Sequence, residues 1–450
     1  MLFYSTNRKS PLLTARDAIL KGLAPDRGLY MPSEIPFFSK NEIETFGKMS
    51  YADIAARILG CYLSEDIEAK LLGEFCHEAY NFDTPLEKID GNRFLLRLDR
   101  GPTASFKDYA ARIMARLMNY FLEKENRYTS ILTATSGDTG SAVASAFYGM
   151  ERIKVVILYP EHEVSELQRK QMTTLGGNIS VIAVRGKFDD CQFMVKQAFS
   201  DPQLGSMDLS TANSINIGRL LPQSVYYFYA FSRLINEYSD VVFSIPSGNF
   251  GNMMGAMLAG RMGLPVKRIV ISVNSNDEFP RFLSEGKYQK VEPSVNCLSS
   301  AMNVGHPSNL ARLVDLFGGE MDEQGEIRKM PDLARLREET AAFSINDSET
   351  LRVMAEFRKR YRALIEPHGA VGWAGLERYI SAEDPAGDTA YLVLETAHPA
   401  KFPEIVHKAT GILPEVPVSV SELKGRPESF TTIANNYAEL RLFLKAGRNL

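Results

Sequence analysis

A lysine and two glycine-rich turns are the parts of this sequence best suited to chemistry. Lys107 follows Phe106 and precedes apolar residues at helical spacing, so we expect it at the start of a helix. The turns are Thr-Ser-Gly-Asp-Thr-Gly at residues 135–140 and Ser-Gly-Asn-Phe-Gly-Asn at residues 247–252. A buried lysine, a small-residue turn and a turn that cradles phosphate are what a Schiff-base enzyme using pyridoxal phosphate needs.

The turn at residues 247–252 has the setting of a phosphate site. It follows a predicted strand at residues 241–245 and opens a predicted helix at residues 252–262. Glycine lets the backbone approach an anion closely, and the first N–H groups and the dipole of the helix favour negative charge. The alternative is a tight strand-to-helix turn that requires small residues for packing alone.

The turn at residues 135–140 follows a predicted strand in the same way. Its hydroxyl and N–H groups suit a substrate carboxylate, and the alternative is a helix N-cap formed by Ser136 or Asp138. For Lys107, the functional interpretation requires a desolvated amine whose lowered pKa makes it nucleophilic near neutral pH. The alternative for Lys107 is a solvated ammonium group that pairs with Asp108 or with a distant acid.

Two polar segments complete the set of candidates. Residues 395–399, Glu-Thr-Ala-His-Pro, end an apolar strand, where Thr396 presents a hydroxyl to a ring nitrogen or simply precedes a proline that closes the strand. In residues 213–219, Ser214, Asn216 and Arg219 offer hydroxyl, amide and guanidinium groups to a second phosphate, on the substrate. The alternative for this segment is a polar loop.

The order of predicted elements indicates how these residues are positioned. Strands alternate with helices from about residue 85, which implies parallel sheets with right-handed crossovers. The first 85 residues carry helical periodicity, as a small, mainly helical module. We expect two parallel α/β domains with ligand sites beyond the carboxyl ends of the strands. The domains are predicted at residues 1–85 (helical module), 86–124 with 216–450 (large) and 125–215 (small).

Composition excludes several classes of function. The chain has 450 residues, is 45% hydrophobic and 24% charged, and carries a formal net charge of −4, so we predict neither nucleic acid nor a membrane as partner. The four cysteines form no CxxC pair, and the six histidines show no metal-ligand spacing, so no metal is predicted. Neither a signal peptide nor an apolar span is evident, and we expect a cytoplasmic protein.

The ordered set of motifs resembles the threonine synthase family, within the fold type II (tryptophan-synthase-β-like) pyridoxal-phosphate enzymes. The N-terminal module is similar to that of the bacterial and fungal branch. The resemblance implies conversion of O-phospho-L-homoserine and water to L-threonine and phosphate by γ-elimination and β-addition of water. The motifs that carry it lie at residues 3–6, 26–30, 101–103, 106–108, 135–140, 213–219, 246–252 and 395–402.

The same resemblance implies roles for single residues. Lys107 forms the Schiff base with pyridoxal phosphate and then serves as base, with Phe106 beside the cofactor. Thr396 meets the pyridine nitrogen. The cofactor phosphate is held by Gly248, Asn249, Phe250, Gly251 and Asn252.

For the substrate, the resemblance implies that Ser136 and Thr139 bind the carboxylate. Asp138, which belongs to the same turn, stands where many fold type II enzymes have an asparagine that contacts the ring oxygen of the cofactor. An aspartate donates a hydrogen bond there only when it is protonated.

Two other functions stay open at this point, and the chain is expected to act as a monomer or a homodimer. A related phospholyase would use the same chemistry to release a 2-oxo acid, ammonia and phosphate. A non-catalytic carrier or interaction protein is expected to lack Lys107 or one of the glycine turns, and all three are present.

Overall fold

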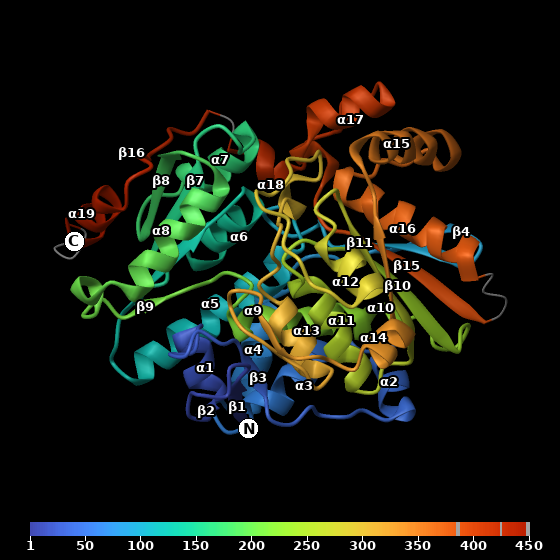
Figure 1. Ribbon diagram of the computed structural model, residues 1–450, viewed down its shortest axis with the longest axis horizontal. Helices are drawn as coiled ribbons and strands as arrows, with labels where there is room; N and C mark the ends of the chain where they lie inside the picture. The colour runs from blue at the N-terminus through green and yellow to red at the C-terminus, as the bar shows by residue number, and fades with distance from the viewer. Residues whose placement is uncertain (384–387, 424, 447–450) are drawn as a thin grey trace.

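Two separate β-sheets, each covered by helices, form the two lobes of the molecule (Figure 1). The computed structural model describes residues 1–383, 388–423 and 425–446. The larger sheet has six strands, which are parallel except for the antiparallel pair β4–β5. Its strands, in spatial order, are β14 (Thr340–Ser344), β11 (Val266–Val273), β10 (Asp240–Pro246), β15 (Thr389–Glu395), β5 (Arg93–Arg97) and β4 (Leu86–Asp90).

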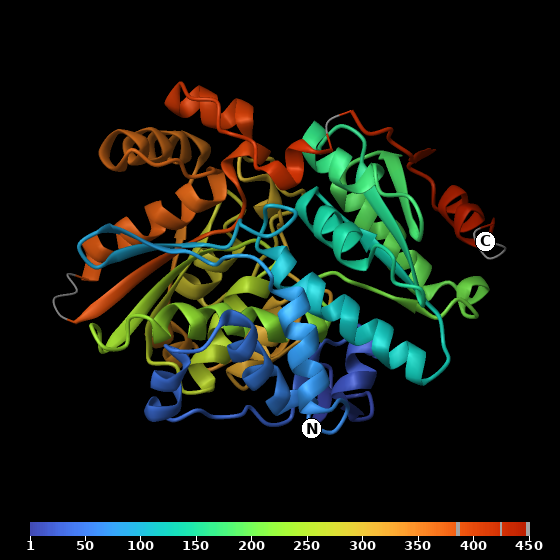
Figure 2. The ribbon, with the colours of Figure 1, turned by 180° about the vertical axis from the view of Figure 1, so that it is seen from behind.

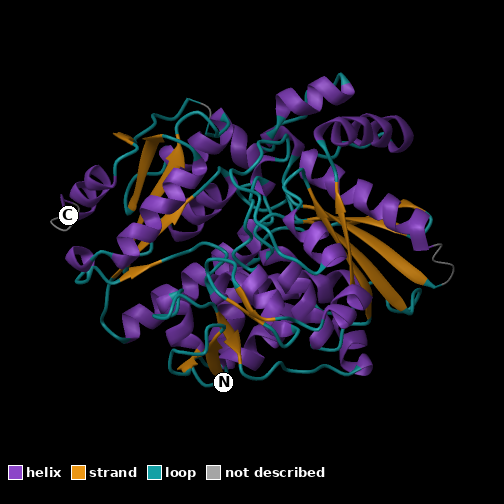
Figure 3. Cartoon of the chain, in the orientation of Figure 1, coloured by secondary structure: helices purple, strands orange, loops and turns teal. Residues whose placement is uncertain are grey.

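The smaller sheet has five parallel strands. In spatial order they are β16 (Thr431–Ala434), β8 (Ile179–Arg185), β7 (Ile153–Pro160), β6 (Thr129–Ala134) and β9 (Leu209–Ser210). Its helices are α6 (Asp138–Phe147), α7 (Glu166–Thr173), α8 (Phe188–Ser200) and α19 (Tyr437–Ala446). Loops fill much of the space between the two sheets (Figure 3).

Most of the remaining helices lie around the larger sheet. Among them, α16 packs on β10, β11 and β15, and α15 packs on α16. These helices are α5 (Lys107–Lys124), α9 (Ile217–Leu220), α10 (Val225–Ser232), α11 (Gly251–Arg261), α12 (Glu278–Glu285), α13 (Leu310–Leu316), α14 (Leu333–Glu339), α15 (Asp347–Tyr361), α16 (Pro367–Glu383), α17 (Pro403–Thr410) and α18 (Val418–Ser421). A two-stranded ribbon, β12 (Glu320–Met321) and β13 (Ile327–Lys329), follows α13.

The N-terminal module lies beneath both lobes, as the view from behind shows best (Figure 2). Its helices are α1 (Ala15–Lys21), α2 (Lys40–Phe46), α3 (Tyr51–Leu63) and α4 (Ala69–Ala79). It also contains a small antiparallel sheet, which the helical periodicity did not indicate: β2 (Leu13–Thr14), β1 (Leu2–Ser5) and β3 (Tyr30–Pro32).

The predicted fold of two largely parallel α/β sheets is confirmed, and two further details differ from the prediction. Strand β16 pairs with β8, so residues 431–446 lie with the smaller sheet, whereas 216–450 were all expected with the larger one. The four residues of β16, Thr-Thr-Ile-Ala, are too few and too polar to predict a strand. The aromatic stretch at residues 221–238, whose sequence suggests one long helix, is not regular throughout: it begins as a 3₁₀ turn at Leu221–Ser224 and continues as α10 only to Ser232.

The described helices include none that is long and apolar enough to cross a membrane.

Arg312 on α13 ties the N-terminal module to the larger lobe. Its side chain is fully buried, and it donates to the carbonyl oxygens of Tyr30 at 3.1 Å, Ser214 at 3.1 Å and Ile215 at 2.7 Å. A fourth hydrogen bond, of 2.7 Å, reaches Asn309 Oδ1. Among the described residues, no carboxylate is hydrogen-bonded to Arg312, and burial lowers the pKa of Arg312 to about 9 against the opposing charge of Asp315. The guanidinium group is therefore balanced by backbone carbonyl dipoles from two separate segments, residue 30 and residues 214–215, and by the side-chain oxygen of Asn309.

We predict that Arg312→Ala destabilises the protein by about 3 kcal/mol or more, because several buried acceptors lose a charged donor and a cavity opens. The measurement is the midpoint of thermal unfolding. Arg185→Ala is the control, because the Arg185 side chain is 71% exposed and we expect its removal to change stability by about 0.5 kcal/mol at most. Equal midpoints for the two variants would contradict this role of Arg312.

Candidate active site

A short backbone pairing brings Lys107 beside the end of strand β15. The N–H group of Phe106 donates to the Thr396 carbonyl at 2.9 Å, and that of His398 donates to the Ala104 carbonyl at 3.0 Å. Lys107 is the first residue of α5, as predicted. The pairing therefore places the lysine next to Thr396, which lies almost 300 residues further along the chain.

The loop before Lys107 is folded onto Asp108. Both carboxylate oxygens of Asp108 accept hydrogen bonds from Thr103, from its N–H group at 2.8 Å and from its hydroxyl at 2.7 Å. At Gly101, a Cβ atom would lie 2.4 Å from Asp108 Oδ2, so only glycine fits. Because Asp108 is engaged by this loop, the alternative in which it pairs with Lys107 does not hold.

Lys107 is held in a dry environment. Its side chain is 13% exposed, its Nζ atom lies 3.8 Å from Asp138 Oδ2, and the same atom lies 4.6 Å from the centre of the Phe106 ring. Burial lowers the pKa of Lys107 to about 8, against the opposing charge of Asp138. The positive charges of Lys401 and Arg219 lower it further. Some of the protein molecules therefore carry a neutral Lys107 amine near pH 7, and a lysine must be neutral to form a Schiff base.

Asp138 makes its shortest contacts with other residues than Lys107. Its Oδ1 atom accepts from Lys401 Nζ at 2.7 Å and from Gln168 Nε2 at 2.8 Å. Although burial alone would raise it, the pKa of Asp138 is held well below its usual range by the charges of Lys401 and Lys107 and by these hydrogen bonds. Asp138 is therefore ionised and can only accept hydrogen bonds.

The turn after β6 is capped by a residue that the sequence did not single out. Thr135 Oγ1 accepts from the N–H groups of Gly137 at 2.9 Å and Gly140 at 2.8 Å, whereas a cap by Ser136 or Asp138 was the alternative considered. Gly137 has a φ of 129°, which favours glycine. The turn thus keeps its shape without the side chain of Ser136.

Ser136 and Thr139 lie on the partly exposed side of this turn. Within the described part of the chain, neither hydroxyl has a hydrogen-bond partner. Both are therefore available to a ligand carboxylate.

The turn after β10 leaves no room for a side chain. A Cβ atom at Gly248 would lie 2.8 Å from Met302 Cα and 2.9 Å from the Ala301 carbonyl oxygen. Phe250, the N-cap of α11, has a φ of 63°, which non-glycine residues adopt rarely. The free N–H groups of the first turn of α11 follow directly. A cradle that only glycine fits, at the start of an eleven-residue helix, suits a phosphate.

Two asparagines support the cradle. Asn249 accepts from the Ser308 N–H group at 3.0 Å and through its carbonyl from Asn309 Nδ2 at 2.8 Å. Asn252 is buried, and its Oδ1 accepts from Tyr226 and Tyr227. Asn252 Nδ2 is buried without a hydrogen-bond partner in the described structure, so it offers a donor to a bound anion.

Arg219 is a buried cation with few protein partners. It is 3% exposed, its Nη1 donates to the Ala212 carbonyl at 2.6 Å, and its Nε lacks a partner among the described residues. Burial lowers the pKa of Arg219 to about 10. An arginine in this state favours an anion, since a buried charge without a counter-charge is costly.

The other two residues expected with Arg219 have structural contacts. Asn216 caps α9 by accepting from the Gly218 N–H group at 2.8 Å, and its Nδ2 donates to the Ile19 and Thr211 carbonyls, each at 2.9 Å. Ser214 Oγ accepts from Asn309 Nδ2 at 3.2 Å. Asn216 therefore holds this loop against the N-terminal module.

Thr396 lies on a buried acidic cluster. Its hydroxyl is 3.5 Å from Glu366 Oε1, and Glu366 also accepts from the N–H groups of His368 at 2.8 Å and Gly369 at 3.0 Å, capping α16. Burial and the charge of Glu366 raise the pKa of Glu395 well above its usual range. Glu395 accepts from the Glu366 N–H group at 2.9 Å, so the two acidic residues are held together at the end of β15.

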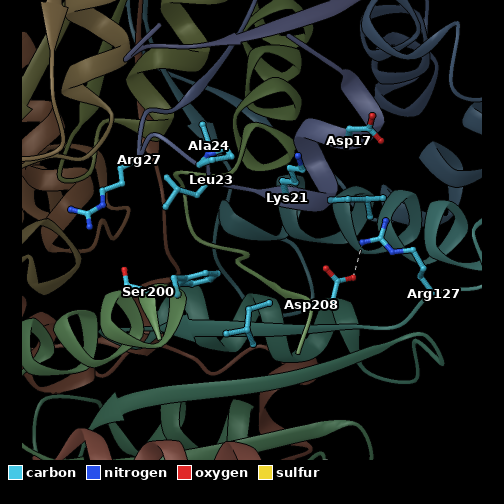
Figure 4. Close-up of a pocket in the computed structure, with 12 residues that line it drawn as sticks. Asp17, Lys21, Leu23, Ala24, Arg27, Arg127, Ser200 and Asp208 are labelled. Atoms are coloured by element: carbon cyan, nitrogen blue, oxygen red, sulfur yellow. Dashed lines mark hydrogen bonds and ion pairs between the residues drawn. The ribbon is translucent and has the colours of Figure 1, made fainter. Parts of the chain in front are cut away.

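A cavity of about 550 Å³ lies elsewhere, between the α1 region and the ends of α8 and β9 (Figure 4). Lys21, Arg27 and the 2.7 Å ion pair between Arg127 and Asp208 contribute to its lining. It contains none of the candidate residues. The candidate active site is therefore identified by the chemical groups of its residues and not by this cavity.

Sequence reasoning missed Lys401, Gln168 and Glu366. Lys401 belongs to the segment at residues 395–402, but a lysine between Ala400 and Phe402 gives no sign of its partner. Glu366 precedes Pro367, the first residue of α16, and an acidic residue in that place is a recognisable helix-capping signal. Within the described residues, no cluster of histidine, cysteine or acidic side chains is suited to hold a metal ion.

Three family models match the chain, and together they span most of it. The model described as pyridoxal-phosphate dependent enzyme matches residues 78–396. The model for the threonine synthase N terminus matches residues 2–80, and the model for the threonine synthase C-terminal region matches residues 369–443.

Full-length relatives agree with these models. The chain is 39% identical to threonine synthase of Haemophilus influenzae over 99% of both chains, and 37% identical to that of Escherichia coli over 98% of both. A crystal structure of PLP-bound threonine synthase from Brucella melitensis superimposes with a TM-score of 0.91 at 34% identity, over 99% of both chains. The chain belongs to the threonine synthase family of pyridoxal-phosphate-dependent enzymes.

Proposed function

We propose that this chain converts O-phospho-L-homoserine and water to L-threonine and phosphate. The observation that carries the proposal is the desolvated Lys107 amine, whose pKa is about 8, in a site that also holds the under-partnered cation Arg219. A reactive amine and a separate cation suit a substrate that has an amino-acid end and a phosphate end. Full-length similarity to threonine synthases selects this substrate among such compounds.

The residues of the second glycine turn fit the phosphate of pyridoxal phosphate. Gly248, Phe250 and Gly251 shape the backbone, Asn249 fastens it to α13, and Asn252 offers its unpaired Nδ2. Phe106 shields the Lys107 amine from water on one side. When bound, the cofactor supplies an aldehyde for a Schiff base and a conjugated ring that takes up the electron pair left by proton removal.

Lys107 moves the protons of the reaction. Once the substrate amine has replaced it, its neutral Nζ takes the proton from the substrate Cα. Loss of a proton from Cβ would then accompany departure of phosphate from Cγ. A proton returned to Cγ would give the methyl group, water would add its oxygen at Cβ and release a proton, and Lys107 would return a proton to Cα before threonine is released. A pKa of about 8 suits both directions of transfer near neutral pH.

The substrate ends are assigned to different elements. Ser136 and Thr139, whose hydroxyls are free of protein partners in the described chain, bind the carboxylate. Arg219 and Ser214 are assigned to the leaving phosphate, and Asn216 holds their loop in place. Asp138 was expected among the substrate ligands, but its ionised carboxylate would repel the substrate carboxylate. We propose instead that Asp138 is the counter-ion of Lys401 and Lys107.

Thr396 is assigned to the pyridine nitrogen of the cofactor. Its hydroxyl is 3.5 Å from Glu366 Oε1, which orients it. The hydroxyl leaves this nitrogen without a full counter-charge, so we expect the nitrogen to carry no stable proton.

A single chain supplies every residue assigned to the site, so we propose that a monomer or a homodimer is active. The four cysteines are all free, which suits the reducing cytoplasm.

Lys107→Ala is predicted to abolish the borohydride-reducible adduct with pyridoxal phosphate and to lower threonine formation by at least about a thousandfold, since nucleophile and base are lost together. Lys70→Ala, at a lysine whose side chain is 90% exposed on α4, is the control and is expected to behave as wild type. Products are measured by assaying threonine and 2-oxobutyrate from phosphohomoserine. Formation of 2-oxobutyrate and ammonia in place of threonine by the wild type would establish the phospholyase alternative.

Gly248→Ala is predicted to weaken binding of pyridoxal phosphate about tenfold or more, because its Cβ atom would overlap backbone atoms of residues 301 and 302. The dissociation constant is measured by absorbance titration of the apoenzyme. Gly260→Ala is the matched control on α11, since a Cβ atom there meets Val266 at an ordinary 3.8 Å. Unchanged affinity in Gly248→Ala would remove this turn from the cofactor site.

A further inference from the structure

We propose that Lys401 is a positioning residue for the reaction, because it neutralises Asp138 and so leaves Lys107 free to give up its proton. The proposal rests on the proposed function in one respect, namely that Lys107 is the reactive amine. It assigns a role to a buried lysine that takes no part in the steps described above.

The contacts of Lys401 are those of a permanent ion pair. Lys401 ends the 3₁₀ turn Pro399–Lys401, and its side chain is fully buried. Its Nζ atom donates to Asp138 Oδ1 at 2.7 Å and to the Thr103 carbonyl at 2.9 Å. Lys107 Nζ lies much further from the same carboxylate, at 3.8 Å from Oδ2. Asp138 therefore has Lys401, and not Lys107, as its main counter-ion.

The charge balance around Lys107 explains why this second lysine matters. The charged groups that act on Lys107 come from four segments: Asp138 on α6, Glu366 before α16, Lys401 in its 3₁₀ turn and Arg219 on α9. Two are negative and two are positive, so their effects on the amine oppose each other. Burial is then the deciding influence, and it favours the neutral amine.

Removing Lys401 alone would upset this balance. Asp138 would become a buried carboxylate with only Gln168 and the distant Lys107 to compensate it, which is a costly state. The simplest relief is for Lys107 to keep its proton and act as the counter-ion. A protonated Lys107 neither attacks an aldehyde nor removes a proton from the substrate. Lys401 thus acts on the chemistry through Asp138.

The test measures the protonation of Lys107 in the apoenzyme, so it does not depend on turnover. The rate at which pyridoxal phosphate forms its reducible adduct with Lys107 is followed from pH 6 to pH 10. A Lys107-containing peptide is identified by mass spectrometry after borohydride trapping. The wild-type rate is expected to rise with pH to a midpoint near the pKa of about 8, because only the neutral amine reacts.

Three variants make the comparison specific. Lys401→Met is expected to raise the midpoint by about one pH unit or more, which means roughly tenfold slower trapping at pH 7. Asp138→Asn is expected to lower the midpoint, because two cations then act on Lys107 without that anion. The double variant Asp138→Asn/Lys401→Met removes both charges and is expected to return the midpoint toward wild type.

Controls separate charge from folding. Lys401→Arg keeps the charge and is expected to restore a midpoint near that of wild type, and Lys408→Met removes an exposed lysine on α17 and is expected to change nothing. Should Lys401→Met fail to fold, Lys401→Gln, which also removes the charge, is expected to raise the midpoint in the same way. Equal midpoints in wild type and in the charge-removing variant of Lys401 would overturn the role of Lys401. Absence of any Lys107 adduct in the wild type would instead overturn the proposed function.

Discussion

The site depends on a backbone pairing between two loops that are far apart in the chain. Residues 104–106 and 396–398 exchange hydrogen bonds beyond the carboxyl end of β15, and this pairing sets Lys107 beside Thr396. The same loop carries Thr103, whose carbonyl accepts from Lys401 and whose N–H group and hydroxyl bind Asp108. One stretch of irregular backbone thus positions the amine, the residue assigned to the ring nitrogen and the counter-ion of Asp138 together.

Desolvation gives these residues their chemistry. Lys107, Arg219 and Arg312 are all buried, and in each the pKa is lowered because water is excluded from the charged group. Their partners differ, and so do their assigned roles. Arg312 is satisfied by four acceptors and is structural, whereas Arg219 keeps an unpaired Nε and suits a ligand. The number of unmet donors, rather than residue type, separates the two arginines.

Much of the fold and part of the site follow from the sequence alone. Strand β10 is largely an apolar run, so its position was predicted, and the turns that follow parallel strands were expected beyond the carboxyl ends of the strands. Short elements escaped prediction, because β16 and the strands of the N-terminal module carry too few apolar residues to show a period. The partner of Asp138 escaped as well, since a contact between residues 138 and 401 exists only after both lobes have formed.

The position of Arg312 in the chain has a consequence for synthesis. The N-terminal module is synthesised before α13. The carbonyl of Tyr30 therefore has no hydrogen bond from Arg312 until roughly 280 further residues have been made. At about 5–20 residues per second, this interval is on the order of 15–60 s. During that time the module lacks its anchor, and the apolar residues through which it packs on the catalytic body, such as Phe38 and Phe46 against Phe228, lack their partners. The nascent chain therefore exposes apolar side chains of this module until the segments that cover them have been synthesised.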